Sequence, residues 1–211
     1  MDSQMIDRAV VSLRLIFWGG MLCVVDVTFS SVTTVNGVSS GFVFDFLNDA
    51  VGAALITVGA ARLSTMEISR RFVSVMHFVV FVAFVVTLDS IRLHFVTDWP
   101  TVVQLGANLI GIVSIVAIPA FCVAMRWLCD DAFLERASRS WSLTLVLFVC
   151  IYVLPLGLLR IAILFASLTG SPFLIDLGPA GLLLLPVFAA PLIHLFMSTS
   201  RMKTDLVNRG V

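Results

Sequence analysis

The sequence predicts an all-α integral membrane protein, a single domain built as a bundle of six transmembrane helices. Its composition is the first observation, because 60% of the 211 residues are hydrophobic and 12% are charged, whereas a soluble domain is about half apolar and about a quarter charged. The second is that apolar stretches long enough to cross a bilayer recur six times along the chain. The third is that basic residues cluster in every second connection. Together they indicate that lipid is the solvent of most of this surface.

A transmembrane helix needs about 20 mostly apolar residues. The six stretches that qualify are 10–35, 44–63, 72–95, 101–128, 141–167 and 178–199. A backbone inside lipid must satisfy its own hydrogen bonds, so each stretch is expected to be helical. The spans of a β-barrel would alternate in polarity over about 10 residues, and these stretches do not. No linker or second domain interrupts the series.

The basic residues predict the orientation of the helices. Eleven of the 13 Lys and Arg residues lie before or near the start of the first stretch, after the sixth, or in and beside the connections between the second and third and between the fourth and fifth. Cytoplasmic loops of membrane proteins carry such an excess of basic residues. Both termini are therefore expected in the cytoplasm.

Three tandem αα-hairpins are a further interpretation of the pattern. Each even-numbered stretch has a polar or small residue three positions before a glycine, in the pairs Asp49–Gly52, Asn108–Gly111 and Gly178–Gly181. Small residues let helices approach closely in membranes. The other interpretation is coincidence, since glycine is common in membrane helices.

Charged residues within or beside the spans are the candidate site. They gather toward the predicted outer side and comprise Asp26, Asp45, Asp49, Asp89, Arg92 and Arg160. A charge inside a membrane costs at least a few kcal/mol and usually has a partner, so we expect Arg160 to meet Asp26 or Asp89. The cluster is either a ligand or ion site or a structural network of ion pairs.

No motif for catalysis or metal binding accompanies these charges. His77 and His194 lie at similar predicted depth and could hold a haem axially, but the alternative of two separate helix histidines is favoured, so no cofactor is predicted. Cys122 and Cys129 lack a CxxC motif or a nearby histidine, and no metal site is predicted. The interpretation therefore leans away from an enzyme.

One segment resembles a known family. The residues Phe44-Asp45-Phe46-Leu47-Asn48-Asp49-Ala50-Val51-Gly52 are similar to an FDxxxDxxG motif of uncharacterised bacterial multi-pass membrane proteins. Asn48 departs from the pattern, which commonly has proline there. The resemblance covers about 20 residues and implies the bacterial inner membrane, without a known activity.

The function most consistent with these features is that of a structural or partner-binding membrane subunit. The expected partners are the lipid bilayer and a second membrane protein or further copies of the chain. Nucleic acid is not expected, because the formal net charge is zero. The alternative is a transporter or channel for a small solute or ion, with its polar site in the outer half of the bundle.

Overall fold

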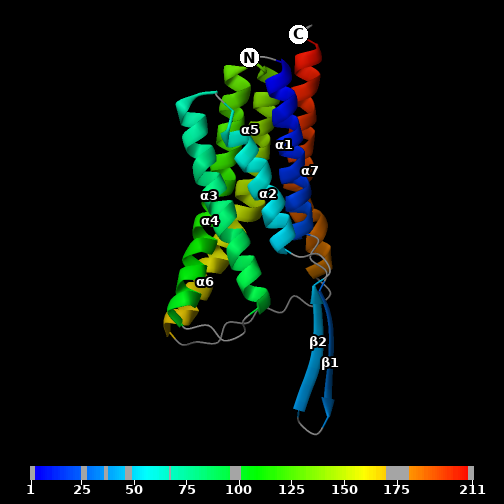
Figure 1. Cartoon of the computed structure of the whole chain (residues 1–211), viewed down its shortest axis with the longest axis vertical. Coiled ribbons are helices and arrows are strands. Elements are labelled where there is room, and N and C mark those ends of the chain that lie inside the picture. Colours follow the sequence, from blue (N-terminus) through cyan, green and yellow to red (C-terminus); the bar gives the residue numbers. More distant parts are fainter. Residues whose placement is uncertain are drawn as a thin grey trace.

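Long helices and one β-hairpin make up the part of the chain that the computed structural model describes (Figure 1). The described residues are 3–24, 28–35, 38–45, 49–66, 68–95, 101–169 and 181–208. The helices are α1 (Ser3–Val24), α2 (Asp49–Ser64), α3 (Arg70–Phe95), α4 (Thr101–Asp131), α5 (Glu135–Phe148), the π-helical turn η1 (Val149–Val153), α6 (Leu154–Thr169) and α7 (Gly181–Val207). Because α5, η1 and α6 follow one another without a break, they form one continuous helix.

The helices form a closed ring in chain order. Each helix from α1 to α4 packs on the next one, and α7 closes the ring by packing on both α5 and α1. Both termini lie at the same end of this ring (Figure 1). We call it the basic end, because α2, α4 and α7 finish there with Arg62, Arg126 and Arg201, and the opposite end is the far end.

Glycines hold α1 and α2 close together. A Cβ on Gly52 would lie 2.7 Å from the carbonyl oxygen of Gly19, and a Cβ on Gly59 would lie 2.7 Å from that of Ser12. No side chain larger than hydrogen fits at these distances. The backbones therefore touch along two successive contacts, the arrangement that small residues allow in membranes.

The core is concentrated at the basic end. Trp141 of α5 is fully buried, packs edge-on against Phe121 of α4 at 5.9 Å, and donates its indole N–H to Met202 Sδ of α7 at 3.3 Å. Asp205 of α7 accepts a hydrogen bond from the backbone N–H of Ala137 at 3.0 Å. This carboxylate satisfies one of the N–H groups that the first turn of α5 leaves open.

Two turns around the ring depart from regular helix geometry. Phe133, between α4 and α5, has a φ of 59°, and the N–H of Leu134 bonds to the carbonyl of Cys129 at 2.8 Å, as in a Schellman motif. Further along, the N–H of Leu154 bonds to the carbonyl of Val149, five residues back. Pro155 follows at once, and its ring would clash with a regular α-turn.

The first two predicted helices were wrong over 28–35 and 44–45, and residues 25–27 and 46–48 lie outside the described residues. Helix α1 ends at Val24, strand β1 spans Thr28–Val35, strand β2 spans Val38–Asp45, and α2 begins only at Asp49. The strands pair antiparallel, with Val35 opposite Val38. The cause is local, because Thr, Val and Phe favour strands and Asn36-Gly37 is the dipeptide preferred in two-residue hairpin loops.

The remaining helices begin or end beyond the predicted limits. The predicted 72–95 is α3, and the predicted 101–128 continues to Asp131 as α4. The predicted 141–167 starts earlier, at Glu135, and the predicted 178–199 continues to Val207. Each of these helices thus continues into polar residues beyond the apolar stretch that predicted it. Residues 170–180, which include the start of the last predicted span, lie outside the described residues.

Within the described part of the chain, three helices are long and apolar enough to cross a membrane. They are Arg70–Ile91, Leu105–Asp131 and Glu135–Ala166. Their outward faces expose large apolar side chains such as Phe81, Val116 and Leu158. These helices indicate a protein that is embedded in a membrane.

Candidate functional site

The charged residues expected at one outer site are dispersed over several elements. Asp26 lies outside the described residues, and so do the side chains of Asp45 and Arg92. Asp49 opens α2 beside α1, where Cys23 Sγ lies 3.8 Å from its carbonyl oxygen. Asp45 ends strand β2 instead of sharing a helix with Asp49. The two residues therefore do not belong to one helix, although the predicted span 44–63 included both.

Arg160 of α6 lies against α4 at a glycine. A Cβ on Gly111 would be 3.1 Å from both Cζ and Nε of Arg160. Among the described side chains, Arg160 forms no ion pair, so the expected pair with Asp89 is not present. Gly52 contacts the preceding helix α1, whereas Gly111 contacts α6. The two glycines of the proposed repeat thus have different roles.

The two histidines have different surroundings. His77 is exposed near the start of α3. His194 of α7 has its Nδ1 2.8 Å from Thr144 Oγ1 of α5. A bis-histidine haem requires both imidazoles to face one space. The described contacts give the pair no such shared space.

A chain of hydrogen bonds between α5 and α7 is the most developed polar feature of the interior. Ser140 Oγ and Thr144 Oγ1 of α5 lie 2.7 and 2.8 Å from Ser198 Oγ of α7. Arg201 donates to Ser140 Oγ at 2.9 Å, and His194 lies at the other end of the chain. Ser140, Thr144 and Ser198 are buried.

The donors and acceptors of this polar chain define what it can do. Because Arg201 can only donate, the proton of Ser140 is free to be shared with Ser198. Ser198 then donates toward Thr144 or His194, which lies 3.5 Å away. A serine nucleophile would need an Oγ that substrate can reach, and both serines are buried. The arrangement therefore suits interhelical attachment, the ordinary use of such side chains in membranes.

The spacing of polar residues in the sequence indicates this chain of hydrogen bonds, although it was not among the predicted sites. Ser140 and Thr144 are four residues apart, as are His194 and Ser198, with Arg201 three further on. Each set falls on one helix face. The sequence does not indicate that α5 and α7 are neighbours.

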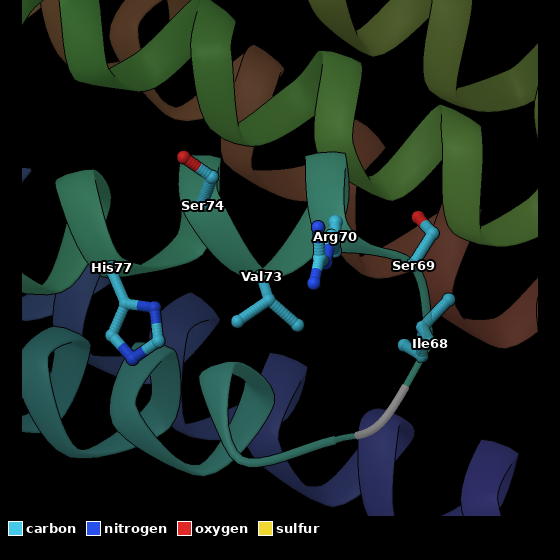
Figure 2. Close-up of a pocket in the computed structure, with 6 residues that line it drawn as sticks. All are labelled: Ile68, Ser69, Arg70, Val73, Ser74 and His77. Atoms are coloured by element: carbon cyan, nitrogen blue, oxygen red, sulfur yellow. The ribbon is translucent and has the colours of Figure 1, made fainter.

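A hollow of about 560 Å³ lies at the basic end, on the outer side of α3. Its lining residues are Ile68, Ser69, Arg70, Val73, Ser74 and His77. Figure 2 shows Arg70, Val73 and His77 pointing to the same side of α3, while the hydroxyls of Ser69 and Ser74 point away from them. The hollow thus presents a guanidinium and an imidazole on either side of an apolar side chain.

The two arginines at the start of α3, Arg70 and Arg71, have different surroundings. Arg71 pairs with Asp131 of α4 at 3.2 Å and lies 5.1 Å from the ring of Trp127. Arg70 forms no ion pair among the described side chains. One arginine therefore joins two helices, and the other faces the hollow.

Within the described residues, no three His, Cys, Asp or Glu side chains gather as metal ligands would. The chain matches no family model, no curated protein and no solved structure. The function therefore has to be argued from the geometry.

Proposed function

We propose that the protein is a structural subunit of the bacterial cytoplasmic membrane, with six spans and both termini cytoplasmic, that associates with further copies of itself. The ring supports six spans, because α1, α2 and α7 pack beside the three long apolar helices. The position of the arginines at one end of the ring supports the orientation. The bacterial membrane rests on the resemblance of the segment 44–52.

The β-hairpin is the observation that carries the self-association. It projects beyond the far ends of the helices (Figure 1), and among the described residues its two strands form the whole sheet. A two-stranded hairpin alone in water is marginally stable and needs further strands or a packed face. A binding partner would supply what this hairpin lacks.

The pairing register gives the hairpin two unlike faces. Phe29 is opposite Phe44 and Ser31 is opposite Phe42. Since alternate positions of a strand share a face, the register places all three phenylalanines at positions of one face. Val43 belongs to the other face, together with Ser30, its cross-strand partner.

A second copy of the chain is the partner that fits this face. The membrane would hold every copy at the same height and in the same orientation, so aromatic faces could meet around a two-fold axis along the membrane normal. Face-to-face packing of sheets with aligned strands is a common arrangement. Confinement to two dimensions raises the effective concentration, so a small face can suffice.

The test is the oligomeric state of Phe42→Asp in lipid nanodiscs or detergent, measured by mass photometry. We expect the wild type to be a dimer or larger and Phe42→Asp to be a monomer. Val43→Asp is the matched control, because it puts the same charge on the other face and should leave the oligomer intact. A monomeric wild type, or two variants that behave alike, would contradict the proposal. A reporter fused after Val211 tests the orientation separately.

Transport of a small solute or ion is the second candidate. It is supported by Arg160 of α6, which forms no ion pair among the described side chains. Uptake by proteoliposomes that Arg160→Gln abolishes would favour transport over a structural role. Equal uptake by the two proteins would remove this candidate.

A further inference from the structure

We infer that the outward face of α3 binds one phospholipid with an anionic headgroup, whose phosphate sits in the hollow beside Arg70. The inference rests on the membrane insertion proposed above, but not on self-association. It arises from a single helix face that changes from cationic to apolar along its length.

The face is defined by residues three, four or seven apart. Arg70 and His77 are exposed on it at the basic end, and the residues that continue it are Phe81, Phe84, Leu88 and Ile91. The spacing keeps all six within one side of the helix. The opposite side of α3 carries Phe72, Met76 and Val79, which are buried in the core.

The polar part of this face matches a phosphodiester. The guanidinium of Arg70 has no partner among the described side chains, and it can donate two parallel hydrogen bonds to phosphate oxygens. His77 lies two turns further along the same face, and the tilt of helical side chains leans its ring back toward Arg70. An imidazole N–H at that level can donate to an ester carbonyl of the lipid, just below the phosphate.

The hollow is open on one side, and its size and its level along the bundle fit this ligand. Its volume of about 560 Å³ is in the range of small-molecule sites. It lies at the basic end, where the positive-inside rule puts the inner leaflet and its anionic lipids. Basic pockets beside transmembrane helices on that side are known to hold anionic headgroups.

The apolar part of the face accounts for the acyl chains. From His77 to Ile91 the helix rises about 21 Å at about 1.5 Å per residue, comparable to the depth of one leaflet, roughly half of the bilayer. Phe81 is 66% exposed and Leu88 is 50% exposed. A soluble phosphate compound would use the cationic hollow and leave this stripe uncovered.

The test compares lipids by native mass spectrometry of the purified full chain in detergent. We expect phosphatidylglycerol to bind about fivefold more tightly than phosphatidylcholine, the ratio expected for one interfacial cation. Arg70→Gln should abolish this preference. Arg71→Gln is the matched control, because it removes the same charge at the next residue. The side chain of Arg71 is already paired with Asp131, so this variant should keep the preference. His77→Leu should weaken phosphatidylglycerol binding about two- to fivefold.

Three outcomes would overturn the inference. The first is equal affinity of the wild type for the two lipids. The second is an equal loss of the preference in Arg70→Gln and Arg71→Gln. The third is displacement of the lipid by millimolar glycerol 3-phosphate, which would identify a soluble phosphate site. If the wild type retained no lipid of either kind, the membrane insertion itself would be in doubt, and the headgroup preference would fail with it.

Discussion

The two ends of the helix ring are built differently. At the basic end, α5 and α7 share Trp141, Met202 and the buried hydroxyls of Ser140, Thr144 and Ser198. At the far end, α4 and α6 run side by side, away from α1, α2 and α7 (Figure 1). The exposed side chains of α6 there include Leu158 and Phe165, each 68% exposed. The basic end therefore maintains the fold, and the far end presents surface.

Removal of the central aromatic residue at the basic end should have the largest effect. Trp141→Ala leaves a cavity among α4, α5 and α7 and should lower the free energy of unfolding by about 3 kcal/mol. Leu158→Ala, at the far end, should change it by less than about 0.5 kcal/mol, since the side chain faces outward. Denaturation of the purified protein in detergent measures both, and equal effects would show that the two ends do not differ.

Substitutions of glycine by alanine test the same difference between tightly packed and open parts of the helix ring. Gly59→Ala places a methyl group 2.7 Å from Ser12 O and should cost about 2 kcal/mol through overpacking. Gly106→Ala in α4 and Gly157→Ala in α6 meet nothing within 4 Å. Both should stabilise the protein by about 0.5 kcal/mol, because alanine is the better helix former. Thermal unfolding of the three variants is the measurement, and a neutral Gly59→Ala would argue against backbone contact between α1 and α2.

Threonines provide a third comparison. Thr144→Val removes the hydroxyl that joins Ser198 and His194, and should destabilise the protein by about 1 kcal/mol, in line with interhelical hydrogen bonds in membranes. Thr169→Val, near the end of α6, should have an effect below about 0.5 kcal/mol. If Thr144→Val unfolds no more easily than Thr169→Val, the polar chain is not an attachment between helices.

Much of the basic end could be predicted from the sequence, and little of the far end. The spacing of Arg62, Arg70, Arg126 and Arg201 correctly grouped the helix ends, because helix length and charge are encoded locally. The ring order and the meeting of Thr144 with His194 depend on which helices are neighbours, which no local pattern states. The hairpin was missed because the apolar content of 28–35 was given more weight than its β-branched residues and the Asn36-Gly37 dipeptide.

The smallest effect is expected in the turn between α4 and α5. Phe133→Gly should raise the free energy of unfolding by somewhat less than 1 kcal/mol, because a φ of 59° is strained for phenylalanine but not for glycine. Ala132→Gly is the control and should lower it, since the same backbone freedom is added where no positive φ requires it. The two melting temperatures should therefore move in opposite directions.

The π-helical turn before Pro155 has a consequence for how the longest helix is divided. One extra residue in a turn rotates everything after it by about 100° about the helix axis. The side of α5 that meets α7 is thus out of phase with the corresponding side of α6, which emerges pointing elsewhere. A one-residue deletion between Val149 and Val153 would restore the phase and should rotate Arg160 about the helix axis. One residue therefore determines which neighbours the side chains of α6 face.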